Sequence, residues 1–298
     1  MGAQFWWFYD VIVAAAILVC IFVTLKSGIM KAAVSFVGFA VSIAIAFSLS
    51  SSLTSSIYSM AVRSSNIKKV NQTLENNDFF ESLSKYIENL GYNVSIDIGQ
   101  LEGICFSGED VDEKLFTYVN NINGRKVDEE SAFINKLHEG YATIISGVVS
   151  KQLSEYSAEY AAEMIRTKPS EIERFMPLLK DPDTHKPAAE FIVDNYLAEP
   201  YKSQVKLIVL LVVLIFFVII TIFIETAAGR NSYMEPSLIT HAISGIIGLM
   251  KAVVIIIMIA VMIRLYVVLG SNKMLFFNHE AIDKTWVFKY FYNFIKDI

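Results

Sequence analysis

A stretch of eighteen uncharged residues, Leu207–Ile224, is the feature that most restricts how this chain can fold. It lies within VKLIVLLVVLIFFVIITIFI, which begins at Val205. An α-helix rises about 1.5 Å per residue, so about twenty apolar residues cross the roughly 30 Å hydrocarbon core of a bilayer. A buried helix of a soluble protein is the alternative interpretation, but such helices are seldom apolar over this length. The stretch therefore predicts a membrane-spanning helix.

The composition differs between parts of the chain and suits two different solvents, lipid and water. Of the 298 residues, 54% are hydrophobic, and the mean hydropathy is +0.47. The apolar excess lies in residues 1–60 and 203–270, whereas residues 61–202 hold 24 acidic and 15 basic residues. Such a division is typical of a membrane protein with a water-exposed domain. We therefore predict an all-α membrane protein with four transmembrane helices and an inserted, mainly helical extracytoplasmic domain.

Two further apolar segments, Val11–Leu25 and Ala32–Leu49, flank the short sequence LKSGIMK near the N-terminus. A single bent helix through this region would place Lys26 and Lys31 in lipid, at roughly 2.5–3.5 kcal/mol each near the bilayer centre. A hairpin avoids that cost, because Gly28 can adopt the backbone angles of a tight reversal. We therefore predict a hairpin at residues 26–31 between two transmembrane helices. The aromatic start FWWFY resembles an interfacial belt at the head of the first helix.

The fourth apolar segment lies within Ile239–Gly270 and is interrupted by charge. Its uncharged core, Ala252–Ile263, is too short to cross a bilayer. We predict that the helix extends past Lys251 and past Arg264, and that both side chains snorkel to the membrane surfaces. These two residues are thirteen positions apart. That separation is about 20 Å along a helix and suits one cation near each face.

The orientation follows from the loops, because positively charged loops favour the cytoplasm. Lys26 and Lys31 in the first hairpin, with Arg230 and Lys251 around the second, predict that both termini and the insert lie outside. The predicted domains are residues 1–60, transmembrane helices 1 and 2; 61–202, the extracytoplasmic insert; 203–270, transmembrane helices 3 and 4; and 271–298, an amphipathic C-terminal tail.

Small residues recur at every fourth position along three of the spans. In lipid, where van der Waals contact replaces the hydrophobic effect, such repeats let helix backbones approach closely. The positions are Ala16, Cys20, Thr24 and Gly28 in the first span, Gly38, Ser42, Ala46 and Ser50 in the second, and Ser244, Gly248 and Ala252 in the fourth. We interpret them as packing seams; a lipid or substrate groove is the alternative.

Asp10 stands at the head of the first span, where a carboxylate is costly unless it meets water or a partner. In the predicted topology it lies at the same outer level as Arg264. We predict an ion pair between Asp10 and Arg264. The alternative is that Asp10 caps the first span in the headgroup layer.

The apolar ends of the chain resemble the colicin V production protein family, CvpA. The resemblance rests on YDVIVAAAILVCIFVTLKSGIMKAAVSFVGFA and ISGIIGLMKAVVIIIMIAVMI, with a similar tail, IDKTWVFKYFYNF, in which Thr285 stands where the family commonly has a serine. The matching positions are Asp10, Gly28, Lys31, Gly38, Gly245, Gly248 and Lys251. The resemblance implies a multi-pass protein of the bacterial inner or plasma membrane. It also implies a role in colicin V or toxin production, in export or in envelope maintenance, without an assigned catalytic reaction.

The insert carries mainly helical signals. Capping-box spacing predicts three helix starts, at Asp78 with Glu81, Asp110 with Glu113, and Ser170 with Glu173. An amphipathic pattern from residue 130 to about residue 166 predicts one long helix. Residues 92–108 alternate more in polarity and predict a loop or short hairpin.

The sequence contains no recognisable catalytic, cofactor-binding or metal-binding set, so we predict that the protein is not an enzyme and needs no cofactor. Neither a GxSxG elbow nor a P-loop accompanies the four histidines, His138, His185, His241 and His279. EDVDE, residues 109–113, lacks the glycine and spaced ligands of a calcium loop, and DPDTH, residues 181–185, fits a turn between helices as well as a metal site. Scattered lysines and a net charge of −5 argue against nucleic acid.

These observations favour a non-catalytic membrane scaffold in contact with the lipid bilayer. In this hypothesis the spans pack together and support a homo-oligomer, and the insert binds an envelope or secretion partner. The competing hypothesis is a channel or transporter subunit formed by oligomerisation. A pathway through one subunit is disfavoured, because transporters usually carry ionisable groups at mid-membrane and the middle of each predicted span has none.

Overall fold

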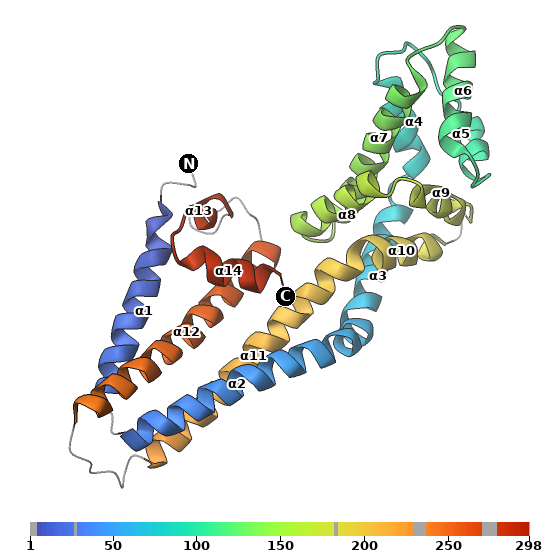
Figure 1. Cartoon of the computed structure of the whole chain (residues 1–298). Coiled ribbons are helices and arrows are strands. Elements are labelled where there is room, and N and C mark those ends of the chain that lie inside the picture. The colour runs from blue at the N-terminus through green and yellow to red at the C-terminus, as the bar shows by residue number, and fades with distance from the viewer. Residues whose placement is uncertain (1–4, 27–28, 182–183, 229–236, 270–278, 298) are drawn as a thin grey trace. The chain divides into compact units, whose positions relative to one another are not determined.

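The computed structural model describes residues 5–26, 29–181, 184–228, 237–269 and 279–297. These residues form helices and turns, with no strand among them. The chain divides into two compact units, residues 1–57 with 202–298, and residues 58–201. We call the first the membrane unit and the second the insert; Figure 1 shows the helices of both along the chain.

Four helices in the described part of the chain are long and apolar enough to cross a membrane, which confirms the predicted number of spans and the all-α class. They are α1 (Trp7–Leu25), α2 (Ile29–Ile57), α11 (Ala198–Ala228) and α12 (Leu238–Leu269). α1 and α2 are separate helices that run in opposite directions (Figure 1). The chain therefore reverses after Lys26, as predicted, although Gly28 lies outside the described residues.

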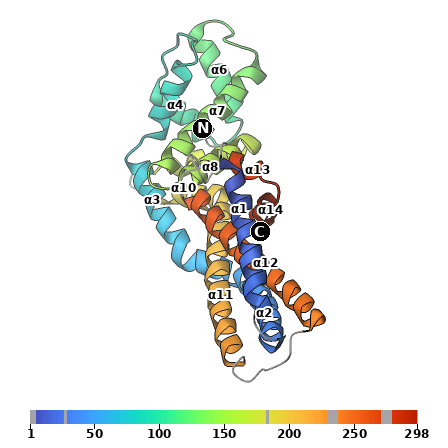
Figure 2. The ribbon, with the colours of Figure 1, turned by 90° about the vertical axis from the view of Figure 1, so that its left-hand side faces the viewer.

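α12 is the most buried of the four long helices. It runs along α1 and also packs against α2 (Figures 1 and 2). Its buried side chains point in several directions around the helix, which explains why its sequence shows no separate polar face. All four long helices leave large apolar side chains exposed, among them Leu18, Phe22, Val37, Val41, Val212, Phe216, Phe223 and Ile246. Lipid tails solvate such side chains without penalty, so this surface fits a bilayer.

The C-terminal segment belongs to the membrane unit. It contains α13 (His279–Asp283) and α14 (Phe288–Lys296), and α14 packs on α12 and touches α1. Phe288, Tyr292 and Ile295 form the buried face of α14, at the spacing of one helical stripe. The tail thus contains a helix that docks on the bundle.

The insert is a helical domain built around α7. Its helices are α3 (Arg63–Glu75), α4 (Phe79–Glu88), α5 (Ile98–Cys105), α6 (Val111–Asn123), α7 (Glu130–Ser150), α8 (Glu155–Thr167), α9 (Glu171–Phe175) and α10 (Lys186–Ile192), with a 3-10 turn, η3 (Met176–Leu179). α7 packs against α8, α4, α6 and α3. It buries Phe133, Leu137, Tyr141 and Ile145, which repeat every fourth position and so form one stripe.

Two π-helical turns lie beside helices of the insert: η2 (Tyr58–Val62) precedes α3, and η4 (Val193–Leu197) follows α10. The guanidinium of Arg63 donates two hydrogen bonds to the carboxylate of Asp194, at 2.7 and 2.6 Å. This bidentate geometry is the favoured one for arginine and a carboxylate. It connects α3 to η4 within the insert.

Two predictions about the insert are wrong. Residues 98–105, expected as loop or hairpin, form α5, because the Asp97 carboxylate accepts the Gln100 N–H and caps the helix, and Leu101 and Cys105 are buried one turn apart. The long helix expected from residue 130 is broken at residues 151–154 into α7 and α8. Ser154 starts the second piece by accepting the Ser157 N–H.

The helix caps agree with the sequence in one of three places. Asp78 caps α4 as predicted, accepting the N–H groups of Phe80 and Glu81 at 2.8 and 3.1 Å. Asp110 makes no cap hydrogen bond; it has a φ of 49°, and Glu173 accepts the Val111 N–H at 3.1 Å from the neighbouring α9. Ser170 likewise forms no side-chain cap to α9. The α6 N-terminus is therefore satisfied by tertiary contact rather than by its own capping box.

Candidate functional site

Asp10 binds the start of α14. Its carboxylate accepts backbone N–H groups from Trp286, Val287 and Phe288, at 2.7, 3.0 and 3.1 Å. The first turn of a helix has N–H groups without helical partners, and its dipole favours negative charge. Asp10 thus supplies from α1 the cap that Val287, at the N-cap position, does not provide.

Thr285 completes this junction. Its buried hydroxyl donates to the Ile282 carbonyl at 2.7 Å and accepts the Lys289 N–H at 2.8 Å. A serine could make the same two hydrogen bonds, so the hydroxyl is the property that this position requires. The tail motif IDKTWVFKYFYNF therefore covers the connection between α13 and α14 and most of α14 itself.

Replacing Asp10 with asparagine should loosen α14. Asparagine keeps the size of the side chain but loses the charge and offers one acceptor oxygen instead of two, so we expect a loss of about 1–2 kcal/mol in the local stability of α14. Hydrogen exchange of the amides at 286–288 should accelerate accordingly. Asp283→Asn, at an exposed carboxylate of α13, is the matched control and should leave the exchange unchanged. Equal exchange in both variants would contradict the role of Asp10.

The structure does not bring Asp10 and Arg264 together. No ion pair joins them in the described part of the chain, and the partners of Asp10 are the three N–H groups of α14. Arg264 is only 5% exposed and lies among the buried residues of α12. It turns into the bundle, whereas the sequence analysis predicted that it snorkels to the membrane surface.

Lys251 forms an ion pair with Glu225 between α12 and α11. The Nζ–Oε1 distance is 2.8 Å, and both side chains are largely buried, at 12% and 15% exposed. The ammonium also lies 5.8 Å from the centre of the Phe39 ring on α2. We predicted that Lys251 snorkels to the membrane surface; in the structure it contacts a carboxylate and an aromatic ring from two other long helices.

The register of α1 against α12 places the backbone of Lys251 relative to the Lys26 end of α1. Gly248 lies against Cys20 and Ile21 of the antiparallel α1 (Figure 1). Lys251 is three residues further on and so is level with about residue 18 of α1, roughly 12 Å from the Lys26 end of that helix. Side chains on a helix lean toward its N-terminus, which carries the ammonium back toward Glu225, near the end of α11. The pair therefore joins α12 to α11 at a position that apolar residues flank on α12.

Two of the four motif glycines stand where helices cross. A Cβ on Gly248 would lie 2.6 Å from the Cα of Ile21, and one on Gly38 would lie 2.3 Å from the Thr221 side chain of α11. Gly245 has nothing within 4 Å of the same position, and Gly28 lies outside the described residues.

The remaining motif and seam residues are partly or fully buried. Lys31, in the first turn of α2, is partly buried. The seam residues Cys20, Thr24, Ser42, Ala46, Ser50, Ser244 and Ala252 are buried, which supports the packing interpretation.

Sequence reasoning missed the partners rather than the motif residues. Glu225 is the first charged residue after the eighteen-residue apolar run, and this position was a signal that it faces a cation in the bundle. Thr221 carried no comparable signal, although its hydroxyl lies 3.4 Å from that of Ser42.

The insert contains one compact set of polar side chains beneath its surface. Asp112 lies 2.6 Å from His138 Nε2, and its other oxygen accepts the hydroxyl of Tyr141 at 3.0 Å. Burial, with the nearby Asp112 carboxylate, raises the pKa of Tyr141 well above its usual value. Burial also raises the pKa of the neighbouring Cys105 thiol to about 12, so this thiol is not an activated nucleophile. The cluster joins α6 to α7.

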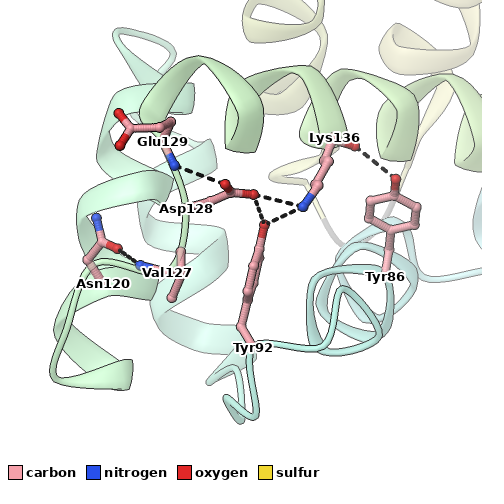
Figure 3. Close-up of polar contacts among 7 residues, drawn as sticks. All are labelled: Tyr86, Tyr92, Asn120, Val127, Asp128, Glu129 and Lys136. Atoms are coloured by element: carbon pink, nitrogen blue, oxygen red, sulfur yellow. Dashed lines mark hydrogen bonds and ion pairs between the residues drawn. The ribbon is translucent and has the colours of Figure 1, made fainter.

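A second polar network fixes the loop before α7, as Figure 3 shows. Lys136 on α7 donates to Asp128 at 2.7 Å and to the Tyr92 hydroxyl at 3.2 Å, and Tyr92 donates to the same carboxylate at 3.1 Å. Asp128 also accepts the Glu129 N–H at 3.0 Å. The hydrogen bond from Lys136, followed by those from Glu129 and Tyr92, lowers the pKa of Asp128. The network ties the loop after α4 to the start of α7.

This network predicts an acid-sensitive contact. Because the Asp128 pKa is lower in the folded state, its contribution to stability is present above its unfolded value of about 3.9 and is lost as the pH falls through the folded value. The protection of the amides at residues 127–137, relative to their intrinsic exchange rate at the same pH, should therefore fall below about pH 4. Asp128→Asn should weaken this acid response, whereas Glu159→Gln, at an exposed position of α8, should retain it. An unchanged response in Asp128→Asn would contradict the assignment.

The described residues hold no group of three or more His, Cys, Asp or Glu side chains placed to bind a metal. EDVDE starts α6, and DPDTH includes residues 182 and 183, which lie outside the described ranges. His241 is exposed on α12, and His185 precedes α10. Cys20 and Cys105 are both buried free thiols.

The four long apolar helices define this chain as a multi-pass membrane protein. No protein-family model, curated protein sequence or solved structure matches it. We therefore interpret its polar residues from the contacts described above.

Proposed function

We propose that this protein is a non-catalytic membrane scaffold of the CvpA type in the bacterial inner or plasma membrane. Its role is in colicin V or toxin production, or more broadly in export and envelope maintenance. The insert lies outside the cytoplasm and binds an envelope or secretion partner, and the membrane unit anchors the chain in the bilayer.

The observation that carries this proposal is how the membrane unit uses its polar and small residues. Asp10 contacts the start of α14, Gly248 contacts α1, and both Gly38 and Lys251 contact α11. Such contacts fix the relative rotation and register of helices in lipid. Because these residues make contacts within the unit, they favour a rigid scaffold.

Cysteine accessibility tests the orientation on which this function depends. In a Cys20→Ser, Cys105→Ala background, single cysteines replace Lys31, Glu130 and Lys284, and intact cells receive a membrane-impermeant maleimide. We expect labelling at positions 130 and 284, and at position 31 only after permeabilisation. Labelling of position 31 alone in intact cells would place the insert in the cytoplasm and overturn the proposed partner class.

Deletion of the gene tests the role itself. We expect lower export of colicin V in a producing strain, restored by the wild-type chain and by His138→Ala. The histidine variant separates scaffolding from catalysis, since a hydrolase that used His138 would lose its activity. Normal export and an intact envelope after deletion would contradict the proposal.

A channel or transporter subunit is the second candidate, and the Lys251–Glu225 pair favours it. Ionisable residues on membrane-spanning helices often mark ion or substrate pathways. Purified protein in liposomes should then pass ions or small solutes, and Glu225→Gln should change the flux. Liposomes that remain sealed at high protein content favour the scaffold.

A further inference from the structure

α14 has an exposed aromatic row in addition to its buried face. This row consists of Trp286, which stands just before α14, and of Tyr290 and Phe294 within it; they are 72%, 68% and 52% exposed. Tyr290 and Phe294 are four residues apart and so lie on one side of the helix. A helix that faces water normally carries charged residues at such positions. The exposed side of α14 therefore fits an environment that is neither water nor protein core.

The aromatic row is continuous with the apolar surface of the spans. The Trp286 ring lies 5.5 Å from that of Trp6, and the adjacent Trp7 is half-exposed at the head of α1. At the other end of α14, the Phe294 ring lies 5.8 Å from Phe47 on α2. In Figure 1, α14 runs across α12 rather than along it. The row thus extends the lipid-facing surface sideways at one end of the bundle.

The polar groups of α14 suit the same environment. Lys289 lies with its ammonium 5.5 Å from the Tyr290 ring, and Lys296 stands exposed in the last turn. Asp10 satisfies the N–H groups at the start of α14, which would otherwise be costly in a poorly hydrated layer. Tryptophan and tyrosine with lysine are the residues enriched where a membrane meets water.

We propose that α14 is an interfacial helix, which lies in the headgroup layer on the side of the α1 N-terminus with its aromatic row in lipid. The occupant of the exposed face is the bilayer itself. Residues 279–297 contain three lysines and three acidic residues, so this contact does not require anionic lipid. The inference goes beyond the proposed function, because it holds for a scaffold and for a channel alike.

The three tryptophans of the chain, Trp6, Trp7 and Trp286, make a direct test possible. Trp6→Phe with Trp7→Phe leaves Trp286 as the single fluorophore. The full chain is reconstituted in phosphatidylcholine vesicles that carry quenchers at different depths on the lipid chains. We expect the strongest quenching from labels about 5–10 Å below the headgroups, and weak quenching from aqueous iodide.

The control places tryptophan on an exposed apolar position of the insert. Ile122→Trp on α6, in a chain without the other three tryptophans, should respond to iodide and not to the lipid quenchers. Tyr290→Trp in a chain with Trp6, Trp7 and Trp286 changed to Phe repeats the lipid measurement at a site within α14. Strong iodide quenching at positions 286 and 290 would show that this segment faces water. Protection from both quenchers at these sites would show a protein partner or a second copy of the chain. Either result would overturn the proposal.

Discussion

Gly248→Ala should destabilise the membrane unit by about 1–3 kcal/mol, and Gly248→Leu by more. The new Cβ would meet the Cα of Ile21 at 2.6 Å and the Cys20 carbonyl oxygen at 3.0 Å. Both are backbone atoms, so no side-chain rotation relieves the clash and α1 must move away from α12. In lipid that separation forfeits the van der Waals contact that joins the two helices. Thermal unfolding of the purified protein in detergent measures the loss.

Gly245→Ala is the matched control for this prediction. It lies one turn before Gly248 on the same helix, and nothing stands within 4 Å of its new Cβ. Alanine also favours a helix more than glycine does, so the change should be neutral or slightly stabilising. If Gly245→Ala and Gly248→Ala lower the unfolding temperature equally, close packing of α1 on α12 is not what the glycine provides.

Removing one partner of the Lys251–Glu225 pair should cost about 3–5 kcal/mol, because the other charge is then left unpaired in a largely buried place. Lys251→Met and Glu225→Met should each lower stability strongly. The double variant should recover much of the loss, since it removes both charges together and leaves two apolar side chains in an apolar layer. A double-mutant cycle on unfolding free energies gives the coupling.

The exposed pair of Glu81 and Lys85 on α4 provides the comparison. Both of its side chains are more than half exposed, so solvent screens the attraction and the pair is worth at most about 1 kcal/mol. Glu81→Gln should therefore have a small effect. If the coupling free energy between Lys251 and Glu225 is as small as that of the exposed pair, water reaches the Lys251–Glu225 pair. That result would favour the channel over the scaffold.

The local sequence pattern was sufficient to predict the structure where that structure depends on the composition of one helix. The run from Leu207 to Ile224 and the polar hairpin after Leu25 each identify their helices without tertiary information. Asp78 was recognised as a cap because cap and helix are adjacent in the chain. The same reasoning was wrong at Asp110, where Glu173 from another helix takes the N–H.

Only part of the candidate site could be predicted from the local sequence. Asp10, Gly248 and Lys251 were recognised as unusual residues for their surroundings, yet their partners lie 276, 227 and 26 positions away. Asp10 was paired with Arg264 on the basis of depth alone. Depth follows from counting residues, whereas the direction in which a side chain faces depends on the rotation of each helix about its axis.

The sequence by itself determined that four helices are long and apolar enough to cross a membrane and that a charged helical domain separates the second from the third. It did so because lipid admits long uncharged helices and excludes most others. Only the tertiary structure decided that Asp10 holds α14, that Gly248 rather than Gly245 meets α1, and that Lys251 meets Glu225. The physical reason is that apolar helices tolerate many rotations and registers in lipid, and a few close contacts select one of them.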